Sequence, residues 1–259
     1  MKVVVCVKQI PDPAIPGQLQ SDTRTLNRDD KLILDESDSY GVEMALQLVE
    51  AAGGGQVSLV SMAPRSETSG LRTALAMGAD DAVLISDDAL AGSDALATAK
   101  VLGAAISELD ADLVLAGTES SDGYTGTVPE MVAGVMGMPS VTFAKHIEIT
   151  DGIASVQRQT EAGYDQVECA LPAVVSVTAG VVEPRYPSFK GIMAAKKKPV
   201  DAKDLAALGI DASAVGVAGA RQETVEVTDA AEREAGEIIT DEGDAHTNIV
   251  EFLTELKVI

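Results

Sequence analysis

The sequence predicts an α/β protein built on a doubly wound, mostly parallel sheet, and two observations lead to this prediction. Over residues 1–140, short apolar runs alternate with longer amphipathic segments. In composition, 46% of the residues are hydrophobic but only 3% are aromatic. Small and branched aliphatic side chains therefore form the core, which is typical of buried parallel strands joined by right-handed crossovers.

The strands and helices of this first part follow one another in order. Apolar runs of strand length predict strands at residues 2–7, 57–60, 82–85 and 113–116. Capping residues or apolar stripes with helical spacing predict helices between and after them. Their expected ranges are about 35–52, 66–77, 93–109 and 128–135.

The pattern changes after Pro139. Segments 140–149, 153–159, 165–171 and 173–178 alternate without helical periodicity, and Asp151-Gly152 is a hairpin signal. We therefore expect antiparallel strands that extend the sheet or form a side flap.

Two segments have no obvious place in this scheme. Residues 9–31 form a polar stretch too long for an ordinary connection, and such loops are often functional. Residues 183–203 are basic, whereas residues from 221 onward carry eleven acids and three bases. We expect a domain at 1–200, followed by an extended acidic arm at 201–259 that ends in a helix and needs a partner surface to pack on.

Charge and composition exclude several classes of function. The net charge of −22 argues against nucleic acid or anionic lipid as a main partner. No apolar run is long enough for a membrane span, and the first residues form a strand and not a signal peptide, so we expect a cytoplasmic protein that is not a membrane protein. The two cysteines and two histidines lack metal-ligand spacing, and no motif of a hydrolase or covalent catalyst is present.

The best candidate for a small-molecule site is the turn at 117–127. It is rich in glycine and hydroxyl residues and directly precedes a helix, so its backbone N–H groups can bind a phosphate, with Thr125 and Thr127 as further donors. Composition alone supports a simple helix cap equally well. In a doubly wound sheet, this turn, the loop after the first strand and the start of the 38–52 helix converge at the carboxyl ends of the strands.

The segment 183–193 mixes Phe189, Ile192 and Met193 with prolines, glycine and bases, without a helix or strand period. One interpretation is a buried connector whose apolar groups fill the core. The other is an exposed apolar anchor surrounded by cations, which suits docking to acidic partners.

Several runs closely resemble the beta subunit of electron-transfer flavoproteins. The most specific are residues 171–176 (Leu-Pro-Ala-Val-Val-Ser) and 183–198 (Glu-Pro-Arg-Tyr-Pro-Ser-Phe-Lys-Gly-Ile-Met-Ala-Ala-Lys-Lys-Lys). Residues 5–12 and 71–80 also match. The family signature at 156–175 is only partly kept, because Ala162 and Asp165 depart from it.

The resemblance implies a Rossmann-like, adenine-nucleotide-hydrolase-like fold and an electron carrier without catalytic residues of its own. An alpha subunit would hold most of the FAD, and this chain would shelter one flank of it and pack its arm on that subunit. Electrons would come from acyl-CoA and related dehydrogenases, as in fatty acid β-oxidation, and pass to a membrane quinone reductase.

The family's AMP pocket, carried over position by position, falls on the convergent segments described above. It comprises Cys6, Asp35, Ser37, Asp38, Met62, Asp122, Gly123, Tyr124, Thr125, Gly126, Thr127 and Val128. Acids repel a phosphate, so we expect Asp35 and Asp38 to face the adenine or ribose, or to cap the helix. Electron-bifurcating relatives hold a second FAD in this pocket; AMP is the favoured ligand.

The resemblance also implies a recognition loop for dehydrogenases, with Phe189 as the apolar anchor and Lys196, Lys197 and Lys198 steering association. The residues assigned to this loop are Arg185, Tyr186, Ser188, Phe189, Lys190, Gly191, Ile192 and Met193. Two rivals are a stand-alone adenine-nucleotide-binding protein, which would not need this loop, and an adenylating enzyme. The enzyme would require a glycine motif after the first strand, where residues 8–13 have none.

Overall fold

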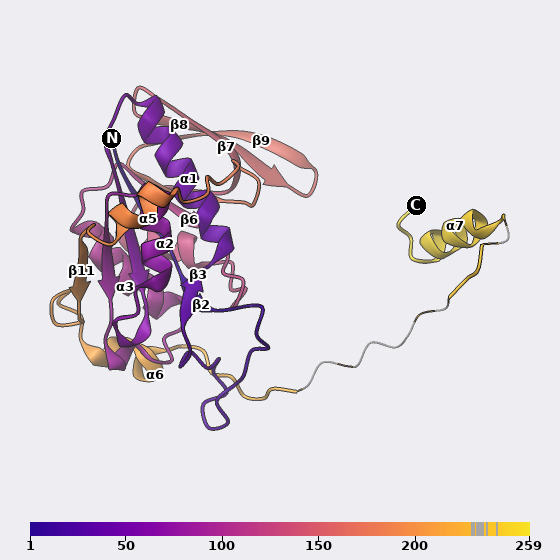
Figure 1. Cartoon of the computed structure of the whole chain (residues 1–259), viewed down its shortest axis with the longest axis horizontal. Helices are drawn as coiled ribbons and strands as arrows, with labels where there is room; N and C mark the ends of the chain where they lie inside the picture. The colour runs from indigo at the N-terminus through magenta and orange to yellow at the C-terminus, as the bar shows by residue number, and fades with distance from the viewer. Residues whose placement is uncertain (229–230, 232–235, 237, 242) are drawn as a thin grey trace. The chain divides into compact units, whose positions relative to one another are not determined.

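The computed structural model describes residues 1–228, 231, 236, 238–241 and 243–259. It divides into two units, Met1–Thr224 and Val225–Ile259. Residues 229–230, 232–235, 237 and 242, which belong to the predicted acidic arm, lie outside the described residues. The larger unit is an α/β domain with helices packed on a large sheet (Figure 1), which confirms the predicted fold class.

The sheet of the larger unit has nine strands within the described residues. All neighbours from β11 through to β7 pair in parallel, and β7, β8 and β9 pair antiparallel. In spatial order the strands are β11 (Val200–Lys203), β5 (Asp81–Ile85), β4 (Gln56–Met62), β1 (Lys2–Cys6), β6 (Leu113–Gly117), β10 (Ala173–Val177), β7 (Ser140–Thr150), β8 (Ile153–Thr160) and β9 (Gly163–Ala170).

The four predicted helices of the first part are present and cover both faces of the sheet. On one face α1 (Glu36–Ala51) and α2 (Ser69–Met77) pack over a core that includes Val3 and Val5. On the other face α3 (Ala95–Ser107) and α4 (Val128–Met136) pack over a core that includes Val4. Burial on both faces explains why β1 is a continuous apolar run and does not alternate.

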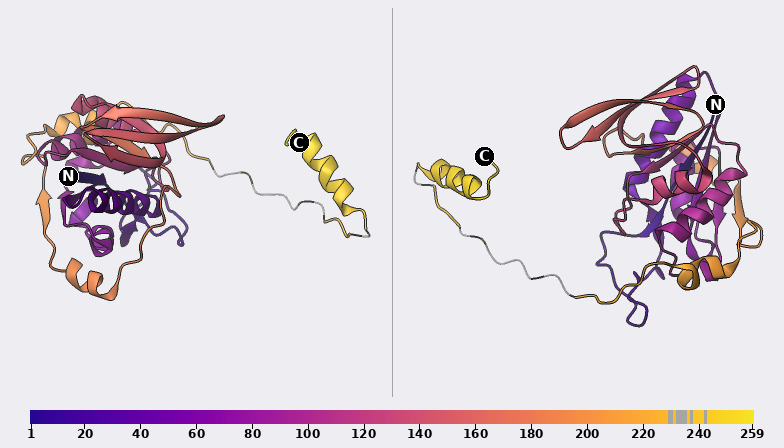
Figure 2. Two further views of the ribbon diagram at one scale, coloured as in Figure 1. Left: turned by 90° about the horizontal axis from the view of Figure 1, so that it is seen from above. Right: turned by 180° about the vertical axis from the view of Figure 1, so that it is seen from behind.

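The expectation of antiparallel strands after Pro139 is correct for β7, β8 and β9 but wrong for β10. This last strand lies between β6 and β7 and is parallel to both. The chain leaves the parallel sheet along β7, forms two hairpins, and returns to insert β10 beside β6. Figure 2 shows the β7–β9 ribbon extending beyond the rest of the domain.

The polar stretch after β1 contains two strands that the sequence did not predict. β2 (Gln9–Pro11) pairs antiparallel with β3 (Leu32–Leu34) and closes the base of the long loop. Each strand has only three residues, which is too short to show a period.

The larger unit continues to Thr224, beyond the boundary predicted at residue 200. β11 extends the sheet at β5, and Leu205 and Val215 are buried. The remaining helical elements of this unit are η1 (Pro64–Ser66), η2 (Asp88–Leu90), α5 (Phe189–Ala195), η3 (Ala212–Ala214) and α6 (Gly216–Gly219). Helix α5 begins within the segment 183–193, which shows no helical period in the sequence.

The second unit contains the terminal helix that the sequence predicts, α7 (Ala245–Glu255). The apolar side chains of Ile249 and Phe252 in this helix, and of Leu256 at its C-cap, are each more than half exposed. None of the described helices combines the length and the apolar character that a bilayer span requires.

Candidate nucleotide site and partner-binding helix

The strand order places a crevice at the carboxyl ends of β1 and β6. Strands β4, β5 and β11 lie on one side of β1, and β6 and β10 lie on the other, so the connections after β1 and β6 diverge. Ligands of doubly wound folds bind at such a switch point. Three segments meet there through hydrogen bonds: Lys8 after β1, the start of α1, and the turn 118–127 after β6.

Asp35 joins two of these segments. Its carboxylate is fully buried, and one oxygen accepts hydrogen bonds from the backbone N–H (3.1 Å) and hydroxyl (2.8 Å) of Ser37. Asp35 thereby caps the N-terminus of α1. The other oxygen accepts from the N–H (2.7 Å) and hydroxyl (3.1 Å) of Ser121 in the turn. Of the roles expected for this residue, the structure shows the helix cap.

Asp38 lies beneath the crevice. Its buried carboxyl group accepts a hydrogen bond of 2.6 Å from the backbone N–H of Lys8. Burial, reinforced by nearby Asp35, raises the pKa of Asp38 from 3.8 to about 8, so the group is mostly uncharged at neutral pH. A neutral Asp38 does not repel a phosphate. A Cβ atom at Gly117 would lie only 2.8 Å from Oδ1 of Asp38, which explains the glycine at the end of β6.

Cys6, Met62 and Val128 contribute apolar surface. All three are partly buried and pack against the core on the α3–α4 face. Burial, with a smaller contribution from Asp38, raises the pKa of the Cys6 thiol to about 12. The thiol is therefore inert, and no described residue links Cys6 or Met62 to the turn by a hydrogen bond.

Asp122 in the turn binds two cations that the sequence analysis did not assign to the site. Its nearly buried carboxylate receives Lys8 Nζ at 2.6 Å and also binds the guanidinium of Arg28 from the long loop. Burial would raise the pKa of Asp122, but Lys8 and Arg28 together hold it below its ordinary value. We call these three residues the Asp122 clamp. Lys8 could have been assigned to the site, because it lies just after β1 at the carboxyl edge of the sheet. Nothing in the sequence around Arg28 indicates that it belongs to the site.

The N-terminus of α4 follows the clamp. No described residue accepts a hydrogen bond from the backbone N–H groups of Thr125, Gly126, Thr127 or Val128, and the hydroxyl of Thr127 makes no capping bond. Gly126 has a φ of +64°, which glycine adopts without strain, and Tyr124, two residues earlier, is exposed. Free N–H groups at a helix N-terminus, next to bound cations, are suited to an anion.

The predicted partner-binding segment divides into anchored and exposed residues. Arg185 was predicted to contact a partner, but its guanidinium binds Glu43 (2.6 and 3.0 Å) and Glu50 (3.0 Å) of α1. Burial would raise the pKa of Glu43, but hydrogen bonds from Arg185 and Gln47 lower it below its usual range. Arg185 therefore anchors the segment to the domain.

Helix α5 packs on α2 through its small residues and backbone. A Cβ atom at Gly191 would lie 2.4 Å from the carbonyl oxygen of Ala76, so this contact requires glycine. Ser188 caps α5 by accepting a hydrogen bond of 3.0 Å from the N–H of Gly191. Lys198, expected to steer partners, instead donates from Nζ to the carbonyls of Leu75, Gly78 and Ala79 at the end of α2.

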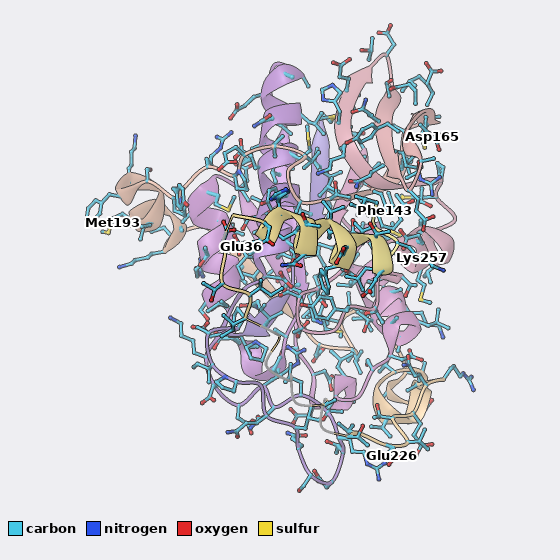
Figure 3. The ribbon with its side chains drawn as sticks, turned by 90° about the vertical axis from the view of Figure 1, so that its right-hand side faces the viewer. Glu36, Phe143, Asp165, Met193, Glu226 and Lys257 are labelled. Atoms are coloured by element: carbon cyan, nitrogen blue, oxygen red, sulfur yellow. The ribbon has the colours of Figure 1, made fainter. Side chains whose placement is uncertain are left out.

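The large apolar side chains of this segment face solvent. Phe189 is 83% exposed and Tyr186 93%, while Ile192 and Met193 are about half exposed. Figure 3 shows Met193 on α5 projecting away from the domain. The buried-connector interpretation is therefore wrong for Phe189. Lys190, Lys196 and Lys197 are exposed beside these residues.

Comparison with known proteins gives consistent matches. A family model described as the electron transfer flavoprotein domain matches residues 23–208. The electron transfer flavoprotein subunit beta of Mycobacterium leprae is 41% identical over 99% of both chains. That of Megasphaera elsdenii is 33% identical over 98% of this chain and 97% of its own. The caffeyl-CoA reductase-Etf complex subunit CarD of Acetobacterium woodii is 35% identical over 93% of this chain and 92% of its own.

Proposed function

Because this chain belongs to the electron transfer flavoprotein family and matches its beta subunits over almost its whole length, we propose that it pairs with an alpha subunit to carry electrons in the cytoplasm. The pair takes electrons from acyl-CoA and related dehydrogenases and delivers them to a membrane quinone reductase. An FAD held mostly by the alpha subunit supplies the redox chemistry. This chain shelters the flavin, binds a nucleotide and docks partners, with no catalytic residue of its own.

The proposed nucleotide is AMP, and the observation that supports it is the set of free N–H groups at residues 125–128 beside the Asp122 clamp. One helix N-terminus provides donors for one phosphate. Three of the acids near the crevice do not oppose this, because Asp35 is fully hydrogen-bonded, Asp38 is mostly uncharged and Asp122 is paired with two cations. Cys6, Met62 and Val128 offer apolar surface to the remainder of the nucleotide.

A second candidate is an electron-bifurcating subunit with another FAD in place of AMP. It is favoured by the likeness to the CarD subunit, whose name places it in a caffeyl-CoA reductase-Etf complex. Co-expression with the alpha subunit, denaturing extraction and chromatography separate the two. One FAD and one AMP per heterodimer is the expected result; two FAD molecules support the second candidate, and the lack of any adenine nucleotide beyond one FAD contradicts both.

A threonine variant tests where the nucleotide binds. Thr127→Ala removes a hydroxyl next to the free N–H groups, so AMP retention should weaken by about fivefold, the value of one hydrogen bond. Thr68→Ala is the matched control, since Thr68 also precedes a helix without making a capping bond. Equal retention of AMP by both variants would place the phosphate elsewhere.

A further inference from the structure

Met193 differs from the other methionines of the chain in its surroundings. All eight methionines lie in the part of the chain that the structure describes, and Met193 belongs to neither core cluster. Its side chain is 51% exposed and projects from α5 into solvent (Figure 3). The others belong to a cluster or pack against one: Met1, Met44 and Met77 with the cluster on the α1–α2 face, and Met62, Met131, Met136 and Met138 with the cluster on the α3–α4 face.

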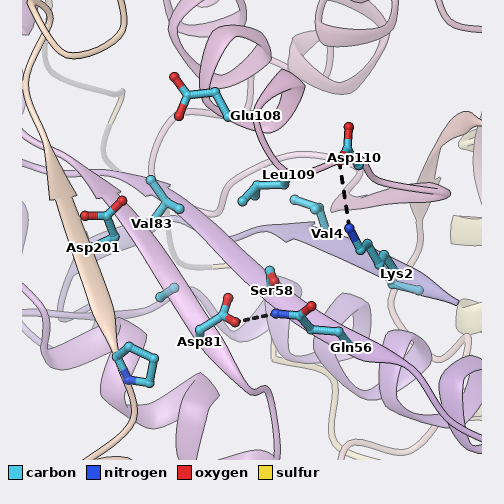
Figure 4. A pocket seen from close by; sticks show the side chains of 13 residues that line it. Lys2, Val4, Gln56, Ser58, Asp81, Val83, Glu108, Leu109, Asp110 and Asp201 are labelled. Carbon is cyan, nitrogen blue, oxygen red and sulfur yellow. Dashed lines mark hydrogen bonds and ion pairs between the residues drawn. The ribbon is translucent and has the colours of Figure 1, made fainter.

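Access decides which thioether a dissolved oxidant can reach. A close-packed core leaves no room for an oxidant molecule, which protects Met44 and Met77. None of the eight methionines lines the open groove where β1, β4 and β5 begin (Figure 4), and a second groove is lined by Met1, which is partly buried. Hydrogen peroxide is small and uncharged, so the net charge of −22 does not repel it. Met193 should therefore react before the other methionines.

Met193 lies on the helix that is proposed to dock dehydrogenases, so any effect of its oxidation on docking rests on that proposed function. It follows Phe189 by four residues, and this spacing places the two side chains on one face of α5. Ile192 beside them is 46% exposed. A thioether suits such a surface because it is apolar and adapts to the shape of a partner.

Oxidation should change the surface of α5 without displacing the helix. Arg72 of α2 donates hydrogen bonds of 2.7 Å to the carbonyl oxygens of Ala195 and Lys198, at and after the end of α5. Gly191 lies directly against the backbone of α2. None of these contacts involves the side chain of Met193, so they remain when its sulfur is oxidised.

We propose that Met193 is a site of reversible oxidation by hydrogen peroxide, and that its oxidation weakens docking of the dehydrogenases. The thioether sulfur attacks one oxygen of the peroxide, so an S–O bond forms while the O–O bond breaks. The sulfur loses two electrons to the departing oxygen, which also takes the proton of the transferred oxygen and leaves as water. The resulting sulfoxide is polar, and burying it in an apolar pocket of a partner without a hydrogen-bond donor is unfavourable.

Peptide mass spectrometry of the full heterodimer during treatment with hydrogen peroxide tests the first part of the proposal. We expect Met193 to gain one oxygen before any other methionine of this chain does. In the same samples, binding to an acyl-CoA dehydrogenase should weaken by about tenfold, as for a buried polar group without a partner. Treatment with methionine sulfoxide reductases should restore binding.

Two leucine variants assign the loss of binding to one residue. Met193→Leu keeps the apolar volume and should bind equally well before and after peroxide. Met131→Leu is the matched control, because Met131 packs against a core cluster, and it should lose binding on oxidation as the unmodified protein does.

Slower oxidation of Met193 than of another methionine of this chain would overturn the proposal, whether or not α5 docks dehydrogenases. Complete oxidation that leaves binding unchanged, or that weakens Met193→Leu equally, would also overturn it. Phe189→Ala shows which claim has failed. Normal binding by Phe189→Ala contradicts the docking function itself, whereas weak binding by Phe189→Ala beside normal binding by the oxidised protein contradicts only the role of Met193.

Discussion

At the residue scale, several acids of this highly acidic chain form specific interactions inside the domain. Asp35 caps a helix, Asp122 holds Lys8 and Arg28, and Glu43 holds Arg185. Each has a partner far away in the sequence. Asp35 also binds Ser121, and the separation reaches 142 residues for Glu43 and Arg185. From composition alone, acidic residues are expected at the surface. Only the folded structure identifies the few that are buried.

Asp38 should make stability depend on pH. Burial raises its pKa from 3.8 to about 8, so between these values the folded chain holds a proton that the unfolded chain has released. The free energy of unfolding should therefore fall as pH rises through this window, by at most about 1.4 kcal/mol per pH unit from this group. Urea unfolding across the window should show a shallower slope in Asp38→Asn and an unchanged slope in Asp165→Asn. An unchanged slope in Asp38→Asn would mean that Asp38 is ionised in the folded chain.

Arg185 should contribute to stability even though its segment is proposed to bind partners. Arg185→Met leaves Glu43 buried without its cation and should lower the free energy of unfolding by about 1–3 kcal/mol, a value reduced because the arginine is partly exposed. Adding Glu43→Gln should recover part of the loss. The measurement is a double-mutant cycle by urea unfolding, with Lys190→Met as an exposed control. Additive losses would rule out a direct interaction.

At the element scale, α5 combines a fixed backbone with exposed apolar side chains. Gly191 and Lys198 hold it to α2, and Arg185 fixes the preceding segment to α1. Phe189 and Tyr186 remain uncovered. This arrangement presents an apolar anchor in a defined position, which reduces the entropy lost on docking.

Phe189→Ala should therefore separate docking from folding. We expect the melting temperature of the heterodimer to stay nearly constant, because the side chain is 83% exposed. Its affinity for an acyl-CoA dehydrogenase should fall by about tenfold or more, as expected for an aromatic anchor. Tyr164→Ala, which removes an exposed aromatic from β9, is the control. A dehydrogenase that binds both variants equally well would show that Phe189 is not the anchor.

The elements that the sequence predicted are those whose pattern is local. Val4 and its neighbours identify β1, and Gly78 marks the end of α2, because burial and helix termination leave direct traces in the chain. The parallel pairing of β10 and the helix at Phe189–Ala195 depend on contacts between distant segments. For the same reason the turn 117–127 could be identified as a candidate site, whereas Arg28 could not.

At the scale of the whole molecule, the chain has one large domain and a small second unit. The domain contains both core clusters, and the large apolar side chains of α7, such as Ile249 and Phe252, are more than half exposed. We propose that this unit packs on the alpha subunit, because an amphipathic helix of this length is marginal in water without a partner.

Removal of residues 225–259 tests this proposal. The melting temperature of the isolated chain should be almost unchanged, since no part of either core cluster is lost. Dissociation of the heterodimer should become at least about tenfold faster, because the apolar contacts of α7 would be lost. Surface plasmon resonance with the alpha subunit measures this rate, and an unchanged rate would contradict the proposal.

The exposed face of α7 also bears on how the free chain behaves during synthesis. A chain of net charge −22 repels other copies of itself, which keeps Ile249, Phe252 and Leu256 of neighbouring molecules apart. At about 1 M salt the range of that repulsion shrinks to about 3 Å. Unassembled chains should then self-associate through their terminal helices. The solubility of the chain before it meets its partner therefore depends on its excess of carboxylates over basic groups.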